Sequence, residues 1–164
     1  MEHMTHQEKL KKLGELIKDI DFAMLTTVDD DSGRLHSRPM STQQVEFDGD
    51  LWFFTAVNTG KVSDITLDRQ VNLNYAQPDK HRYVSVSGTA AIVNDRAKME
   101  ELWSPVYKAY FPEGLSDPNL RLLKVTVEEA EYWESDGLIP TAIAFVQALA
   151  GKEVEMGENE KIKL

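Results

Sequence analysis

Apolar residues near the start of the chain recur at steps of three and four, which predicts one face of an amphipathic helix. The members of this stripe are Leu10, Leu13, Ile17 and Ile20. Just before it, Thr5 and Glu8 have the spacing of a capping box, in which a hydroxyl caps the first turn and a carboxylate three residues later binds back. We therefore expect a helix that begins directly after Thr5.

After this helix the pattern changes to short runs of apolar and β-branched residues separated by turn-forming residues, which predicts strands. The expected strands cover residues 22–28, 35–47, 51–55, 71–76, 83–93 and 122–127, the last continuing through 131–133. A turn is expected at 29–33, a tight hairpin at 48–50, and a bulge or sharp bend at Gly88. Further helices are expected at 61–68, at 94–103 with Asn94 as the cap, and at 139–149.

The order of these elements predicts a mainly β fold with peripheral helices. Short sequential strands joined by turns favour an antiparallel barrel of roughly six strands over a parallel sheet. The sequence has no glycine-rich phosphate loop of the Rossmann or P-loop type. We expect residues 1–150 to form a single domain and residues 151–164 to form a charged C-terminal tail that is frayed.

Charge and composition narrow the function classes. The 164 residues carry a formal net charge of −10, which repels nucleic acid and anionic membranes, so neither is expected as a partner. No apolar run approaches the ~20 residues of a membrane helix, and we expect no secretory signal. Cysteine is absent, which excludes thiolate chemistry and is consistent with a cytoplasmic location. His3 and His6 lack the carboxylates that would complete a metal site, so no metal is expected.

Several short motifs occur in one order with short gaps between them. They are FAMLTT at 22–27, HSRPM at 36–40, LWFFT at 51–55, VNL at 71–73, YVSVSG at 83–88 and ELW at 101–103. Together they resemble the general stress protein branch of the pyridoxamine 5′-phosphate oxidase-like, FMN-binding split-barrel superfamily. Residues 110–112, 117–118 and 131–133 are also similar to that branch. The resemblance, over roughly residues 10–151, implies a six-stranded antiparallel split β-barrel that binds FMN as a homodimer, with the flavin sites at the subunit interface.

The resemblance implies that Thr59 and Lys61 hold the FMN phosphate. Both lie in a glycine-containing break before a predicted helix, where a hydroxyl, an ammonium and helix N-terminal amides can converge on an anion. Thr59 stands where serine is more usual in the family, and either hydroxyl can donate. The alternative for Lys61 is an exposed lysine at a helix start, which is electrostatically unfavourable without a nearby anion.

The resemblance places the segment Ser37, Arg38, Pro39 and Met40 along the isoalloxazine ring. Its backbone and Arg38 would then face the polar edge of the ring or the phosphate. Pro39 has no N–H to donate, which excludes ordinary pairing in a central strand. The alternative interpretation is an edge-strand proline beside a surface arginine.

The next candidates are Phe53, Phe54 and Thr55, which would supply ring packing and a polar contact. Side chains alternate along a strand, so the two phenylalanines cannot face the same side. A plain core role is therefore the stronger interpretation for at least one of them.

Three further aromatic residues are candidates for the flavin site. Because the family builds this site between two subunits, Trp103 or Trp133 of one copy would cover the flavin held by the other. Core or interface packing explains the two tryptophans equally well. Tyr83 lies where relatives with oxidase activity direct a polar side chain at the flavin, so its phenol is a candidate substitute.

Three function classes stay open at this point. The first is a flavin-dependent oxidoreductase that takes electrons from a reduced nicotinamide, and the second is a non-catalytic flavin buffer or sensor under stress. Flavin carries its own redox chemistry, so the sequence does not separate these two or assign catalytic residues. The third, a scaffold for haem or a deazaflavin, is disfavoured because His36 is the only histidine near the site. Pyridoxal phosphate synthesis is not expected, because the basic substrate patch of pyridoxamine oxidase has no counterpart near the C-terminus.

Overall fold

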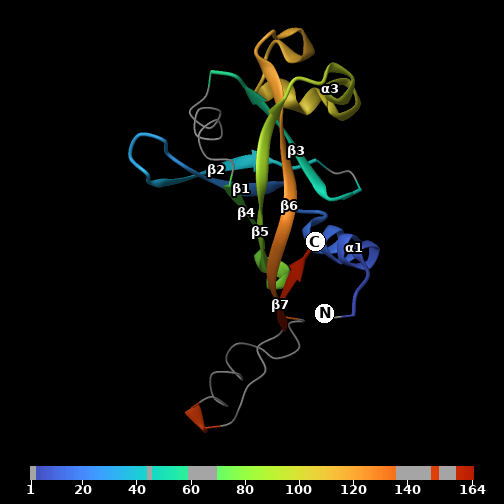
Figure 1. Ribbon diagram of the computed structural model, residues 1–164, viewed down its shortest axis with the longest axis vertical. Coiled ribbons are helices and arrows are strands. Elements are labelled where there is room, and N and C mark those ends of the chain that lie inside the picture. Colours follow the sequence, from blue (N-terminus) through green and yellow to red (C-terminus); the bar gives the residue numbers. More distant parts are fainter. Residues whose placement is uncertain (1–2, 44–45, 59–69, 136–148, 152–157) are drawn as a thin grey trace.

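The computed structural model describes residues 3–43, 46–58, 70–135, 149–151 and 158–164 (Figure 1). The helix predicted at 61–68 and nearly all of the helix predicted at 139–149 lie outside these ranges. The phosphate-site candidates Thr59 and Lys61 also lie outside the described residues. Everything reported below concerns the described part of the chain.

Seven strands form one antiparallel sheet. They are β1 (Phe22–Val28), β2 (Leu35–Ser41), β3 (Asp50–Ala56), β4 (Gln70–Gln77), β5 (Arg82–Val93), β6 (Leu120–Glu134) and β7 (Glu158–Lys163). The short turn η1 (Pro78–Lys80) joins β4 to β5, and α3 (Arg96–Leu102), η2 (Pro105–Ala109) and η3 (Gly114–Ser116) lie between β5 and β6. The mainly β, antiparallel fold is confirmed, with seven strands where the sequence indicates six.

The sheet is not closed, and its end strands are β2 and β3. The strand order is β2-β1-β4-β5-β6-β3, and β7 also pairs with β6. β2 and β3 approach each other without pairing, and we call the line between their edges the seam. The prediction of a hairpin at 48–50 is therefore wrong. The turn forms, but β3 pairs with β6, and the Gly49 carbonyl accepts a hydrogen bond from the Val127 amide at 3.0 Å.

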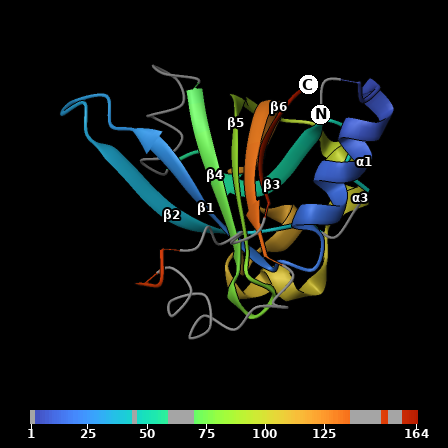
Figure 2. The same ribbon diagram turned by 90° about the horizontal axis from the view of Figure 1, so that it is seen from below.

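The N-terminal helix α1 (His6–Ile17) begins where the capping box predicts. The Thr5 hydroxyl accepts a hydrogen bond from the Glu8 amide at 3.2 Å, and the Glu8 carboxylate accepts one from the Thr5 amide at 2.8 Å. The apolar face of the helix buries Leu13, Leu16 and Ile17 against the sheet. Figure 2 shows α1 flanking the sheet on the side opposite to β1 and β2.

The bulge predicted at Gly88 is confirmed. The register between β5 and β6 shifts between Ser87 and Gly88. A Cβ atom at position 88 would lie 2.3 Å from the carbonyl oxygen of Thr126, so only glycine lets the two backbones approach this closely.

Two element boundaries differ from the sequence predictions. β2 ends at Ser41 instead of residue 47. The next residue, Thr42, is tied to the segment before β1, since its amide donates to the Asp21 carbonyl at 2.9 Å and its hydroxyl donates to the Ile20 carbonyl. The cap of α3 is Asp95 instead of Asn94, with the Asp95 carboxylate accepting a hydrogen bond from the Lys98 amide at 3.1 Å. Asparagine and aspartate are equally good caps, so composition alone does not choose between neighbours.

The prediction of a frayed C-terminal tail is wrong for β7. This strand pairs with β6 in the register Glu129↔Lys163 to Glu134↔Glu158. Alternation turns its charged side chains outward and buries Ile162, which is 1% exposed, in the core. The Lys9 ammonium of α1 also donates to the Lys163 carbonyl at 2.7 Å. Backbone pairing, one buried apolar residue and a hydrogen bond from α1 together dock this charged segment.

The apolar core is divided into two clusters by β3. The large cluster lies between α1 and the sheet and contains Phe53, whereas the small cluster contains Phe54 together with Met99, Leu102 and Tyr107. The expectation that the two phenylalanines face opposite sides is therefore confirmed. Among the described residues, no helix has the length and apolar character that crossing a membrane requires.

Replacing Ile162 tests the docking of β7. We expect Ile162→Ala to lower the free energy of unfolding by about 2–4 kcal/mol, because it empties a buried site. The matched change Lys161→Ala, at an exposed neighbour on the same strand, should alter it by less than about 0.5 kcal/mol. Urea denaturation followed by circular dichroism measures both. If both substitutions left the free energy of unfolding nearly unchanged, β7 would be frayed and not docked.

Candidate functional site

A pocket of ≈ 220 Å³ lies at the seam, and we call it the seam pocket. Its walls come from β1, both end strands and the segment around η2. The lining residues are Phe22, Pro39, Met40, Ser41, Phe54, Tyr107, Tyr110 and Phe111. The structure thus brings together three residues that the sequence analysis assigned to the flavin ring, namely Pro39, Met40 and Phe54. The pocket is strongly aromatic and suits a flat, largely apolar ligand.

Phe54 is the centre of an aromatic cluster on one wall of this pocket. Its ring meets Trp103 edge-on at 5.3 Å between centroids, Tyr107 at 5.3 Å and Phe111 at 6.4 Å. The missing Cβ of Gly114 allows the close approach of Trp103, since a Cβ there would lie 3.2 Å from the indole. Trp103 therefore packs on Phe54 of its own chain. Whether it also covers a partner's flavin stays a prediction.

Aromatic residues reach the pocket because the chain after α3 turns tightly. Pro105 opens η2, the Tyr107 amide donates to Ser104, and the Phe111 amide donates to the Tyr107 carbonyl at 2.8 Å. Burial raises the pKa of the Tyr107 phenol, and the polar side chains of Gln43 and Ser41 partly oppose this shift. The phenol consequently stays protonated at neutral pH and can donate a hydrogen bond to a ligand.

The edge strand β2 presents its residues alternately to two sides. The hydroxyls of Ser37 and Thr26 hydrogen-bond at 2.7 Å on the exposed side. Arg38 turns the other way, is half-buried, and donates from Nη1 to the Thr27 hydroxyl at 2.6 Å. Pro39 lies on an end strand, as its missing N–H requires. Arg38 is thus held by a neighbour and is not a freely moving surface side chain.

Thr55 carries an unusual buried hydroxyl. The residue is 1% exposed, and its Oγ1 has no hydrogen-bond partner in the described structure. A buried polar group without a partner costs about 1–3 kcal/mol. Thr55 lies one residue beyond Phe54 on the edge strand β3. By alternation along the strand, Thr55 shares the side of Phe53 and not that of Phe54, and it does not line the seam pocket. Its polar contact with a ligand stays a prediction.

The remaining candidates lie elsewhere in the chain. Tyr83 and Trp133 face each other across β5 and β6, are 46% and 43% exposed, and do not line the seam pocket. One chain therefore does not bring them to Phe54. A site completed by a second copy is the arrangement in which they could take part.

Sequence reasoning missed five residues of the seam pocket. They are Phe22, Ser41, Tyr107, Tyr110 and Phe111. The signal that could have found the last three is the density of aromatic residues in a short loop that follows a proline, because a loop of this kind rarely keeps several rings without a surface for them to cover. Phe22 and Ser41 carry no signal of their own, since only their pairing in the β1–β2 register reveals them.

One cluster of acidic groups in the described chain is close enough together to be compared with a metal site. The carboxylates of Asp29, Asp30 and Asp31 lie within 4.8 Å of one another in the turn after β1. The Asp29 carboxylate accepts hydrogen bonds from the backbone amides of Asp31 and Ser32, and the Ser32 amide is the main cause that lowers the pKa of Asp29. A turn motif accounts for this cluster.

Two threonines allow a matched test of the orphaned hydroxyl. Without flavin, we expect Thr55→Val to raise the free energy of unfolding by about 1 kcal/mol, because it removes an unpartnered buried group. Thr27→Val should lower it by about 2 kcal/mol, because Arg38 loses the hydroxyl that it binds. Both threonines are 1% exposed, so burial is the same in the two variants. Urea denaturation of the flavin-free protein measures both free energies of unfolding. A lower free energy of unfolding in Thr55→Val would show that the Thr55 hydroxyl has a hydrogen-bond partner.

Comparison with known proteins agrees with this architecture. Residues 8–155 match the sequence model of the family described as pyridoxamine 5′-phosphate oxidase like. The protein bli-3 of Neurospora crassa is 32% identical over 166 residues, which cover 94% of this chain and 79% of that protein.

Solved structures show the same fold. The general stress FMN/FAD binding protein of Xanthomonas citri superposes with a TM-score of 0.69 at 26% identity, covering 92% of this chain and 99% of that one. General stress protein 26 of Bacillus anthracis superposes with a TM-score of 0.65 at 25% identity, covering 79% of this chain and 94% of that one. The likeness thus covers most of the chain and not a single motif. On the match over residues 8–155, the chain belongs to the pyridoxamine 5′-phosphate oxidase-like family.

Proposed function

We propose that this chain is an FMN-binding general stress protein that acts as a flavin-dependent oxidoreductase. The observation that carries the proposal is the seam pocket, where Pro39, Met40 and Phe54 meet among the aromatic rings of Tyr107, Tyr110 and Phe111. A neighbour of the same fold is described as an FMN/FAD binding protein. Thr59 and Lys61, which resemble a phosphate clamp, favour FMN over FAD.

The residues of the pocket suit the parts of the cofactor. Phe54 and Phe111 offer an apolar wall for the flat ring, and the protic groups of Ser41, Tyr107 and Tyr110 are available to its polar edge. Arg38 supplies a cation near the seam, although the chain as a whole is acidic. When bound, FMN supplies the hydride and electron transfer, and we propose a reduced nicotinamide as the electron donor.

A second candidate function is a non-catalytic flavin binder that buffers or senses flavin under stress. The composition of the seam pocket favours it, because none of the described lining residues is Asp, Glu, His, Lys or Cys. Phenols and one hydroxyl are therefore the proton donors that the described lining offers. Stopped-flow reduction of the bound flavin by NADH and NADPH, followed by turnover with oxygen or a quinone, separates the two candidates. In either case we propose a cytoplasmic location.

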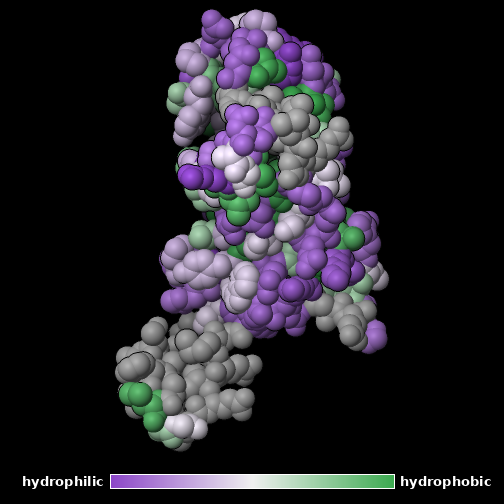
Figure 3. Space-filling model, turned by 60° about the vertical axis from the view of Figure 1, so that its left-hand side comes forward, coloured by the Kyte–Doolittle hydropathy of each residue, from purple (hydrophilic) through white to green (hydrophobic). Residues whose placement is uncertain are grey.

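A homodimer that shares its flavin sites is the assembly we propose. The seam pocket of one chain, at ≈ 220 Å³, is smaller than the roughly 300–1,000 Å³ of typical cofactor sites. The outward face of the sheet exposes Phe22 by 52%, together with the cross-strand pair Tyr83 and Trp133. In the view of Figure 3, apolar side chains also emerge in small groups among hydrophilic ones. A second copy on this face would cover these rings and enlarge the pocket.

Removal of the lysine ammonium tests the cofactor and its phosphate contact together. We expect protein titrated with FMN to show bound-flavin absorption. Lys61→Ala should weaken FMN roughly ten- to a hundredfold, because a charge-assisted hydrogen bond to the phosphate is lost, while riboflavin binding stays unchanged. Lys80→Ala, the same charge change at an exposed turn, serves as control. A flavin-free spectrum at high micromolar FMN would refute the proposal, and equal losses for both ligands would remove Lys61 from the phosphate site.

Linkage between flavin and assembly tests the dimer. If both copies touch each flavin, FMN at a hundred times its dissociation constant stabilises each site by about 2.7 kcal/mol and shifts mass from one copy to two. Analytical ultracentrifugation with and without FMN measures the shift. Trp133→Glu should weaken the dimer, whereas Val106→Glu, at an exposed apolar residue of η2, should not. A monomer with full FMN affinity would place the whole site within one chain.

A further inference from the structure

The seam pocket has a buried phenol among its aromatic rings, that of Tyr107. Tyr107 is 7% exposed, whereas Tyr110, which lines the same pocket, is 59% exposed. The Tyr107 ring is packed between Phe54 at 5.3 Å and Trp103 at 5.8 Å between centroids, and its amide donates to the Ser104 carbonyl at 3.0 Å. A hydrogen bond in a low-dielectric interior is electrostatically stronger than one in water, so a ligand gains more from this phenol than from an exposed one.

Two polar side chains lie in hydrogen-bonding range of the Tyr107 phenol. Ser41, the last residue of β2, lines the seam pocket with it, and Gln43 follows two residues later. Burial raises the pKa of Tyr107, and both side chains oppose that rise. Groups that lower the pKa of a phenol stabilise negative charge on its oxygen, so they leave its hydrogen to be donated elsewhere.

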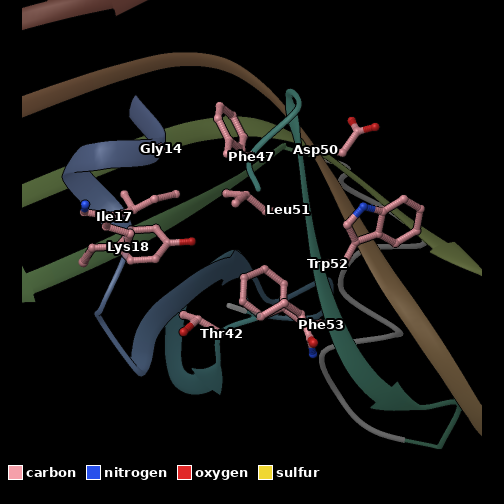
Figure 4. A pocket seen from close by; sticks show the side chains of 11 residues that line it. Gly14, Ile17, Lys18, Thr42, Phe47, Asp50, Leu51, Trp52 and Phe53 are labelled. Atoms are coloured by element: carbon pink, nitrogen blue, oxygen red, sulfur yellow. The ribbon is translucent and has the colours of Figure 1, made fainter. Parts of the chain in front are cut away.

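Gln43 approaches the phenol from outside the seam pocket, which it does not line. It lines a separate cavity of ≈ 170 Å³ between α1 and β3, where Leu51 and Phe53 offer apolar surface (Figure 4). The preceding residue, Thr42, holds the backbone in place, since its amide donates to the Asp21 carbonyl at 2.9 Å. Gln43 can therefore act on a ligand in the seam pocket only through the phenol that it flanks.

The side-chain amide of Gln43 completes no hydrogen bond from Nε2. This atom is buried and has no hydrogen-bond partner within the described ranges. Replacing an unpaired buried polar group by an apolar group of similar shape is close to neutral for stability, or stabilising. Gln43→Leu is therefore a variant that removes the amide without weakening the fold.

We propose that Tyr107 donates a hydrogen bond to a carbonyl oxygen of the flavin ring in the seam pocket, and that Gln43 is a positioning residue that, with Ser41, directs this phenol. The inference rests on the proposed function, because it takes the ring to be bound at the seam. Reduction places more electron density on the ring carbonyls, and a hydrogen bond to a more negative acceptor is stronger. Tyr107 thus favours the reduced flavin and raises its reduction potential.

The reduction potential of bound FMN tests the role of Tyr107. We expect Tyr107→Phe to shift the equilibrium roughly three- to tenfold toward the oxidised flavin, because one hydrogen bond is lost. For a two-electron couple this shift is a fall of about 15–30 mV. Tyr110→Phe is the matched control, since it removes an exposed phenol from the same pocket and should leave the potential unchanged. Spectroscopic titration against a reference dye, at saturating FMN, measures each potential.

A double-mutant cycle tests the role of Gln43. Gln43→Leu should lower the potential of the parent by less than Tyr107→Phe does, because the phenol remains. In the Tyr107→Phe background it should have no effect, because the residue through which it acts is gone. Urea denaturation without FMN should show that Gln43→Leu does not lower the free energy of unfolding, since Nε2 has no partner to lose.

The outcomes separate this inference from the proposed function. An equal shift by Gln43→Leu in both backgrounds would overturn its positioning role. Bound FMN whose potential is the same in the parent and Tyr107→Phe, or shifts equally in Tyr110→Phe, would overturn the inference and leave FMN binding intact. Failure of the parent to bind FMN at high micromolar concentration would instead refute the proposed function, and this inference with it.

Discussion

The pairing of β3 with β6 is the constraint on which the rest of the structure depends. It holds β3 at one end of the sheet, facing β2 across the seam, and leaves both of its faces available to different clusters. In the register Phe53↔Leu123 and Phe54↔Leu122, Phe53 enters the large cluster and Phe54 the small one. A slip by one residue would exchange the two rings and turn Phe54 away from the seam pocket. The fold therefore fixes the site through backbone register before any side chain meets a ligand.

The bulge at Gly88 makes that pairing compatible with the rest of the sheet. β6 pairs with β3 up to Thr126 and with β7 from Glu129 onward, and the register against β5 shifts between these two stretches. One long strand thus changes neighbours at the point where the backbone bends. A side chain at position 88 would collide with the Thr126 carbonyl. The glycine is therefore required by the close approach of the neighbouring strand β6.

The sequence specifies local features better than strand partners. The capping box, the bulge and the opposite orientations of Phe53 and Phe54 are short-range consequences of residue type, and the structure confirms each. The 48–50 turn also forms, but its strands pair elsewhere, because a turn fixes a change of direction and not a partner. The sequence does not predict β7, because only Ile162 among its six residues is buried and one apolar residue makes no alternating pattern. Whether the side chains of Tyr107 and Phe111 face the seam pocket depends on how α3 docks on the sheet. No local sequence pattern encodes that docking.

Unpaired polar groups gather where the sheet is left open. Within the described chain, the buried side-chain atoms without a partner are Gln43 Nε2 and Thr55 Oγ1. One follows β2 and the other lies on β3, so both flank the seam, whereas the paired interior of the sheet contributes neither. Each such group costs the folded state about 1–3 kcal/mol, so the open edge limits the packing of this sheet. The same open edge forms the seam pocket, which we propose as the flavin site.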